Sequence, residues 1–268
     1  MKNNSPIGIF DSGLGGLTVF NQLKKNLPHE QFIYLGDTAH LPYGDKSPKT
    51  IINYSKKISK FLFHKQIKLL IVGCNTASAV ALKEINKMSN VPIVDVIGPC
   101  VDRAVLETQN QSIGIIGTET TIASHSYQKK IHQINDSIKV HTQSCPLFVP
   151  IIEEGLLNHT ILQEAIKLYL SKLKSAMIDT LILGCTHYPI IKAQIKKEIG
   201  LGINIIDSSI VTAEYVENFL KNNKLFSTKK TANEDIFYVT DLSTKFTKIA
   251  AMFLNTRLTN IQSTNLFQ

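Results

Sequence analysis

The chain has 268 residues, of which 43% are hydrophobic and 19% charged, so it is long enough to bury a core in one large or two small domains. No apolar run approaches the ~18 residues of a membrane-spanning helix and no signal-peptide core is seen, so we expect a cytoplasmic protein without a membrane partner. The net charge is +8, but only Arg103 and Arg257 among the 29 basic residues are arginine, and the lysines are scattered. Because arginine is favoured for base and phosphate recognition, we expect no nucleic-acid partner.

Short apolar strands alternate with longer helical patterns along most of the chain. The predicted strands cover residues 6–10, 32–35, 69–72, 92–95, 112–116, 139–142, 180–183, 204–206 and 236–240. Between them, apolar residues recur at helical spacing, as in 51–62, which Ser47 opens as a cap with Pro48 in the first turn. The closing helix of 246–254 has Ser243 as its expected cap. This alternation predicts an α/β fold layered around largely parallel strands.

The chain contains an internal repeat. Three pairs of segments resemble each other in the same order: IGIFDS at 7–12 and IGIIGT at 113–118, GCNT at 73–76 and GCTH at 184–187, PIVD at 92–95 and NIID at 204–207. Short apolar strands resemble each other by chance, but three ordered matches are harder to dismiss. We therefore predict two related α/β halves, the second beginning near Gly98.

Polar residues follow several predicted strands. Examples are Asp11-Ser12, Gly36-Asp37, Cys74-Asn75-Thr76, Gly117-Thr118 and Cys185-Thr186-His187. In open α/β sheets the ligand lies beyond the carboxyl ends of the strands. Two halves that face each other would bring these groups into one cleft.

The four cysteines fall into two classes. None belongs to a CxxC pair, so neither a zinc ribbon nor a disulfide framework is indicated. Cys100 and Cys145 adjoin prolines and are predicted to be small buried hydrophobic residues. Cys74 and Cys185 instead follow apolar strands and precede helix-like stretches. A helix N-terminus favours the thiolate, can lower a cysteine pKa well below ~8.5, and offers amides to a carboxylate.

The neighbours of these two cysteines suggest a ligand. Asn75, Thr76 and Thr186 supply neutral donors for an anion and no rival base. A carboxylate-bearing substrate held between two acid/base thiols follows from this arrangement. Four alternatives remain open: a redox disulfide pair, a zinc ion bound by Cys74, Cys185 and His187, a Cys185–His187 nucleophile, and two structural cysteines.

Other polar segments have two interpretations each. The segment 11–16 looks like a phosphate loop but lacks the Gly-Lys-Ser/Thr ending and the GxGxxG spacing, and Asp11 suits an ammonium group better. Asp37 is either a helix cap or a carboxylate behind the site. Tyr43-Gly44 is either an ordinary turn or a source of backbone amides for a ligand. Glu153 most often would lie on a solvated helix face.

Taken together, these motifs resemble the glutamate racemases of the aspartate/glutamate racemase family. The segments that carry the resemblance are 9–16, 36–44, 74–78, 117–121, 146–150, 153–155 and 184–189, in consistent order between about residues 5 and 254. No motif position departs from the pattern. The resemblance implies an isomerase that interconverts L- and D-glutamate without a cofactor or a metal ion, and so supplies D-glutamate for peptidoglycan of the bacterial cell wall.

The resemblance also implies a fold and roles for residues. It implies two flavodoxin-like, doubly wound domains related by a pseudo-two-fold axis, with residues 1–97 and 208–268 in the first domain, 98–207 in the second, and the active site between them. Cys74 and Cys185 would flank the substrate α-carbon, assisted by Asp11 and His187. The implied substrate contacts are Asp11, Ser12, Tyr43, Gly44, Asn75, Thr76, Thr118, Thr121, Thr186 and His187. A homodimer is expected. An aspartate racemase and a non-catalytic amino-acid-binding protein are the remaining alternatives.

Overall fold

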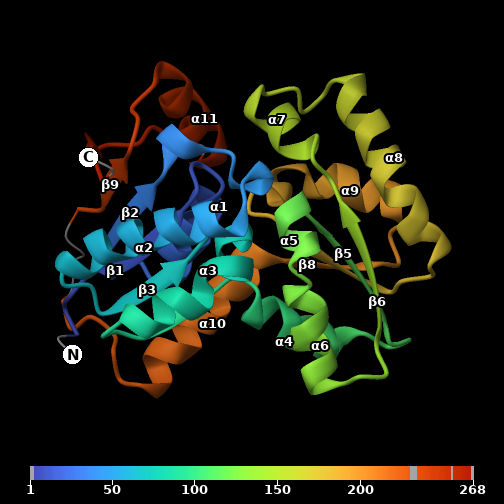
Figure 1. The fold of residues 1–268 in the computed structure, drawn as a ribbon, viewed down its shortest axis with the longest axis horizontal. Coiled ribbons are helices and arrows are strands. Elements are labelled where there is room, and N and C mark those ends of the chain that lie inside the picture. Colours follow the sequence, from blue (N-terminus) through green and yellow to red (C-terminus); the bar gives the residue numbers. More distant parts are fainter. Residues whose placement is uncertain (1–2, 230–233, 255, 267–268) are drawn as a thin grey trace.

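The computed structural model describes residues 3–229, 234–254 and 256–266 (Figure 1). Two parallel sheets lie side by side, each with helices on both faces. The N-terminal strands and the C-terminal elements share one side of the molecule, and the middle of the chain forms the other (Figure 1). None of the helices in these described ranges combines the length and apolarity that a bilayer crossing requires.

The first sheet combines strands from the N-terminal and the C-terminal parts of the chain. Its order is β10-β9-β2-β1-β3-β4, and all of its pairs are parallel. The strands are β1 (Ile7–Asp11), β2 (Phe32–Gly36), β3 (Leu69–Val72), β4 (Ile93–Asp95), β9 (Ile236–Val239) and β10 (Ile261–Ser263). The short edge strand β10 was not predicted, since its residues are half-buried or exposed and form no apolar run.

The second sheet repeats the topology of the first. Its order is β6-β5-β7-β8, built from β5 (Ser112–Gly117), β6 (Lys139–Ser144), β7 (Thr180–Gly184) and β8 (Asn204–Asp207). This order matches β2-β1-β3-β4, so β1 corresponds to β5, β3 to β7 and β4 to β8. The three repeats seen in the sequence therefore occupy equivalent strands, and the predicted pair of related α/β halves is confirmed.

Helices cover both faces of each sheet because alternate strand residues point to opposite faces. On the first sheet, α1, α10 and α11 pack on one face, and α2 and α3 on the other. On the second, α7, α8 and α9 oppose α4 and α6. The helices are α1 (Gly16–Asn26), α2 (Pro48–His64), α3 (Asn75–Met88), α4 (Gly98–Glu107), α5 (Glu119–Ala123), α6 (Ser126–Ile134), α7 (Phe148–Glu153), α8 (Thr160–Ser175), α9 (Lys192–Ile199), α10 (Ser208–Asn222) and α11 (Thr244–Leu254).

The predicted caps are present. The side chain of Ser47 accepts from the backbone N–H of Thr50 at 3.3 Å and opens α2, with Pro48 as its first residue. Ser243 accepts from the backbone N–H of Phe246 at 3.1 Å at the start of α11.

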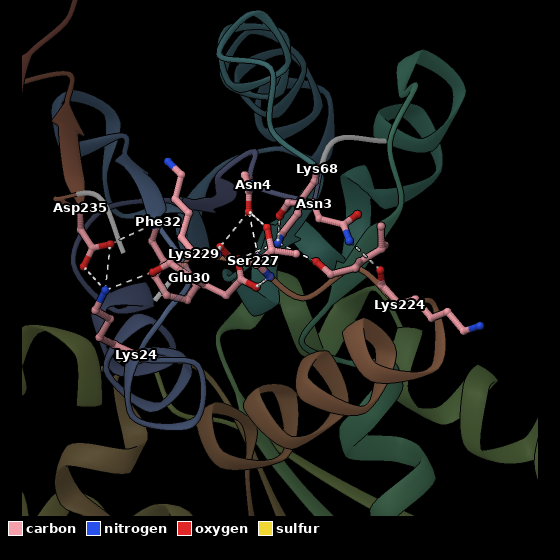
Figure 2. A network of polar contacts seen from close by, with 12 residues as sticks. Asn3, Asn4, Lys24, Glu30, Phe32, Lys68, Lys224, Ser227, Lys229 and Asp235 are labelled. Carbon is pink, nitrogen blue, oxygen red and sulfur yellow. Dashed lines mark hydrogen bonds and ion pairs between the residues drawn. The ribbon is translucent and has the colours of Figure 1, made fainter. Parts of the chain in front are cut away.

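A buried ion pair ties the returning C-terminal segment to the first sheet (Figure 2). The ammonium of Lys68 lies 2.6 Å from the Glu30 carboxylate, and the two side chains are 0% and 3% exposed. Lys68 also donates to the backbone carbonyls of Asn3 and Leu225 at 2.6 and 2.7 Å. The second carboxylate oxygen of Glu30 accepts from the backbone N–H of Ser227 at 2.7 Å. The pair thus holds the chain where it leaves α10 on its way to β9.

Candidate active site

A cavity lies where the carboxyl ends of strands from both sheets meet. It is lined by Ser12, Gly13, Leu14, Leu41, Pro42, Tyr43, Gly44, Cys74, Asn75, Thr76, Thr118, Val149, Glu153, Cys185, Thr186 and His187. Both thiols of the repeated motif therefore face the same space. Twelve residues were expected from the sequence to contact the substrate or to take part in catalysis. Asp11 and Thr121 are the two among them that lie behind this lining rather than on it.

Cys74 is the N-cap of α3. Its sulfur accepts from the backbone N–H of Ala77 at 3.4 Å, and its thiol donates to the Ser12 hydroxyl at 3.4 Å. The sequence predicted that the helix terminus would lower the pKa of this thiol. Burial and the negative charge of Asp11 instead outweigh these hydrogen bonds and raise the pKa of Cys74 to about 12. Cys74 is therefore a protonated thiol at neutral pH, ready to donate.

Cys185 has different surroundings. The helix-like stretch predicted after it is a 3₁₀ helix at Tyr188–Ile191 that leads into α9, so Cys185 does not cap an α-helix as Cys74 does. Its sulfur lies 3.8 Å from Nδ1 of His187, and Nε2 of His187 lies 3.0 Å from the Glu153 carboxylate. These contacts form a Cys–His–Glu series in the cavity wall, in which His187 connects Glu153 of α7 to Cys185. The interpretation of Glu153 as a solvated residue was wrong, since its side chain is only 13% exposed.

His187 is the positively charged member of this Cys–His–Glu series. Burial by itself would lower the pKa of His187, but its hydrogen bonds to Cys185 and Glu153 prevail and raise it to about 10. The imidazole is therefore protonated at neutral pH. The positive charge of the imidazole thus lies beside the sulfur of Cys185.

Replacing Glu153 by glutamine is expected to move the alkaline limb of the pH–rate profile towards neutrality. The substitution removes the negative charge and leaves only a neutral amide oxygen as acceptor, so the pKa of His187 falls from about 10. The raised pKa stabilises the folded protein fully below pH 6.5, and this stabilisation is lost as the pH rises towards 10. The loss of stability in Glu153→Gln should therefore be largest below pH 6.5 and vanish above pH 10.

The measurements are kcat/KM and the melting temperature as functions of pH. Glu154→Gln is the matched control, because Glu154 is the exposed neighbour on the same turn. Profiles of Glu153→Gln that overlay those of the wild type would show that Glu153 does not control His187.

Asp11 ends β1 and is completely buried. One carboxylate oxygen accepts from the backbone N–H of Gly13 at 2.8 Å, and the other, Oδ1, has no hydrogen-bond partner among the described residues. Burial raises the pKa of Asp11, although the positive charge of His187 opposes this. Tyr34 of β2, which the sequence did not indicate, donates to the Gly13 carbonyl at 2.9 Å and supports the same turn.

Threonine hydroxyls join the two halves across the cavity. The hydroxyl of Thr76 lies 2.9 Å from that of Thr118, which lies 2.9 Å from that of Thr121. Thr121 also donates to Thr76 at 3.3 Å. Thr121 therefore supports two lining residues from behind. On the same side, Thr120 donates to the Gly44 carbonyl at 2.7 Å.

Asp37 holds Tyr43 in place. Its buried carboxylate accepts from the hydroxyl of Tyr43 at 2.7 Å and from the hydroxyl of Thr240 at 2.7 Å. Nδ1 of His40 lies 2.8 Å from the same carboxylate. Asp37 does not line the cavity, so of its two interpretations the structure supports the carboxylate behind the site.

The glycines of segment 11–16 serve close packing. A Cβ on Gly15 would overlap the side chains of Thr186 and His187, and the carbonyl of Thr186 accepts from the hydroxyl of Thr18 at 2.8 Å. The loop after β7 thus docks against the start of α1. This contact, rather than a phosphate group, requires the glycine.

The comparison with protein families matches residues 17–216 to "Asp/Glu/Hydantoin racemase". The chain belongs to this racemase family, whose members are isomerases. It is similar to the glutamate racemase of Geobacter metallireducens, with 44% identity over 97% of this chain and 96% of the relative. It is also similar to the glutamate racemase of Persephonella marina, with 47% identity over 91% of each chain.

Solved structures of racemases share the fold. Glutamate racemase from Francisella tularensis in complex with D-glutamate superimposes with a TM-score of 0.94, at 40% identity over 99% of both chains. Aspartate racemase from Picrophilus torridus gives a TM-score of 0.59 at 19% identity, covering 82% of this chain and 99% of that one, which shows likeness of fold alone. The two-part α/β architecture expected from the sequence is therefore confirmed as that of the family.

In this racemase, no group of three or more His, Cys, Asp or Glu within the described ranges is arranged to hold a metal ion. All four cysteines are unpaired and buried, and Cys100 and Cys145 are 0% and 1% exposed, as predicted. The sequence did not indicate Leu41, Pro42 or Val149 in the cavity wall. They lie in segments 36–44 and 146–150, which carry the resemblance, but no role was assigned to these apolar side chains from the sequence.

Proposed function

We propose that this chain is a glutamate racemase that interconverts L- and D-glutamate by proton transfer between Cys74 and Cys185. The observation that carries the proposal is that both thiols line one cavity from equivalent strand ends in different electrostatic surroundings. Cys74 lies beside the carboxyl group of Asp11 and keeps its proton, while Cys185 lies beside the cationic His187. One side is prepared to give a proton and the other to take one. The glutamate racemases that match this chain at 40% identity or more support the same substrate.

The reaction follows from this difference. The Cys185 thiolate removes the α-proton, and the electron pair of the broken C–H bond moves into the carboxylate as an enolate-like intermediate. The Cys74 thiol then delivers its proton to the opposite face of the same carbon. After this step Cys74 is the thiolate and Cys185 the thiol. In the reverse reaction Cys74 removes the α-proton and Cys185 delivers one.

The remaining residues stabilise this intermediate. Asn75, Thr76 and Thr186 offer donors to the α-carboxylate, where negative charge develops. Thr118, Tyr43 and Gly44 complete the wall around the side chain of the substrate. General acid–base groups contribute ~10²–10⁴-fold each, so these electrostatic contacts must provide much of the remaining acceleration.

The test is to incubate the wild-type protein with L- or D-glutamate in deuterated water. We expect loss of the α-proton signal and loss of optical rotation from either enantiomer. A wild type that shows neither is not a racemase, and glutamate binding without exchange would indicate a non-catalytic binding protein. L-aspartate in parallel decides the substrate, because faster exchange of aspartate would exclude glutamate as the preferred one.

The biological setting is also proposed from the resemblance. We infer that the chain acts in the cytoplasm as a homodimer and supplies D-glutamate for peptidoglycan. Its domains are proposed to be 1–97 with 208–268, and 98–207; residues 1–2, 230–233, 255 and 267–268 lie outside the described residues. Rescue of a bacterium that requires D-glutamate would support the metabolic role, and the mass in solution would test the dimer.

A further inference from the structure

Tyr127 of α6 connects the two cysteine segments. It belongs to the half that contains the second sheet and is 1% exposed. Its hydroxyl lies 2.8 Å from Nδ2 of Asn75, the residue after Cys74. Its ring lies against Gly184, the residue before Cys185, where an added Cβ would be 3.3 Å from Cε2 of the tyrosine. One side chain therefore touches both members of the repeated motif.

When Nδ2 of Asn75 points towards Tyr127, only one end of the amide has a hydrogen-bond partner. Oδ1 of Asn75 is then buried without any partner among the described residues. The described hydrogen bonds also contain no acceptor for the Tyr127 hydroxyl proton, since this hydroxyl only accepts from Asn75. Buried donors and acceptors without partners are costly, so two such groups in contact require an explanation.

A half-turn of the amide satisfies both groups at once. The oxygen and nitrogen of an asparagine amide are nearly equal in size, so the rotation needs no further movement. Tyr127 then donates to Oδ1, and the NH₂ group turns the other way. The NH₂ group then occupies the buried position that Oδ1 held, where no described residue offers it an acceptor. Asn75 lines the cavity, so a ligand there is the acceptor that these N–H donors require. A carboxylate only accepts hydrogen bonds, and it needs this orientation.

We propose that Tyr127 is a positioning residue that fixes the Asn75 amide with its NH₂ group towards the substrate carboxylate, an inference that rests on the proposed function. Burial raises the pKa of Tyr127 well above its ordinary value, so the hydroxyl keeps the proton that it must donate. Because Tyr127 comes from one half and Asn75 from the other, the carboxylate site is completed only when the two halves are together.

The test uses Tyr127→Phe, which removes the hydroxyl and keeps the ring against Gly184. We expect KM for both glutamate enantiomers, and the calorimetric Kd for D-glutamate, to rise about tenfold, with kcat within twofold of the wild type. In the Asn75→Ala background the same change should have no effect, because its target is gone. Tyr169→Phe is the matched control: this buried tyrosine of α8 lies outside the cavity wall, and its hydroxyl contacts only the backbone N–H of Leu147 at 3.4 Å among the described hydrogen bonds.

The outcomes separate this inference from the proposed function. A wild type that binds glutamate without racemising it refutes the function alone, and the effect of Tyr127→Phe on Kd still decides the role of Tyr127. An unchanged Kd in Tyr127→Phe, an equal effect in the Asn75→Ala background, or a wild type that binds no glutamate overturns the inference. If Tyr127→Phe fails to fold, nuclear Overhauser effects in the wild type decide. Contacts from the Asn75 NH₂ protons to bound glutamate support the proposed orientation, and contacts to the Tyr127 ring exclude it.

Discussion

Replacing either Cys74 or Cys185 by alanine is expected to lower kcat/KM for racemisation by at least ~10³-fold, within the ~10²–10⁴-fold that one acid–base group contributes. Each thiol serves one face of the α-carbon, and inversion needs both faces. Removing one sulfur leaves either a proton that cannot be removed or an intermediate that cannot be protonated on the new face. Rates of racemisation by optical rotation measure the effect.

The two variants should also differ from each other in deuterium exchange. Each retains one thiol, so each can still remove and return the α-proton of the enantiomer whose hydrogen faces that thiol. Cys74→Ala and Cys185→Ala should therefore exchange opposite enantiomers slowly without inverting them. Cys100→Ala is the control: this cysteine is also buried but lies in α4 outside the cavity wall, so it should lose stability and not activity. Two fully active single variants would exclude the two-thiol mechanism.

Replacing Lys68 by methionine is expected to lower the free energy of unfolding by about 3–5 kcal/mol. The Glu30 carboxylate, 3% exposed, would lose its buried counterion, and the carbonyls of Asn3 and Leu225 would lose their donor (Figure 2). Because these contacts hold the segment between α10 and β9, we expect the C-terminal strands to separate first. Urea unfolding, with hydrogen exchange in β9, measures both effects.

An exposed ion pair provides the control. Lys87 and Glu84 lie 2.7 Å apart within α3, with side chains 61% and 34% exposed. Lys87→Met should lower the free energy of unfolding far less than Lys68→Met, because water already solvates both charges. Glu30→Gln combined with Lys68→Met should recover part of the loss, since no charge is then left buried. If Lys68→Met costs no more than Lys87→Met, the buried pair is not what holds this segment.

The sequence by itself determined the α/β alternation and its repetition. Apolar runs such as 69–72 and 180–183 have strand length and are flanked by turn residues, and these are local properties. The repeat of Gly-Cys after two such runs also identified β3 and β7 as equivalent strands. Since parallel strands carry ligands at their carboxyl ends, the polar residues after them could be assigned to one cavity before any contact was known.

The electrostatic surroundings of the two thiols could be read only from the tertiary structure. Near-identical motifs suggested equal, activated cysteines, yet burial and Asp11 keep Cys74 protonated, while His187 and Glu153 surround Cys185 with charge. The proposed role of Tyr127 also rests on tertiary contacts, because the sequence around it is like that of any buried helix position. Desolvation and charge depend on atoms brought together from distant parts of the chain. A cysteine's neighbours in sequence therefore predict where it lies, and its neighbours in space determine whether it holds a proton.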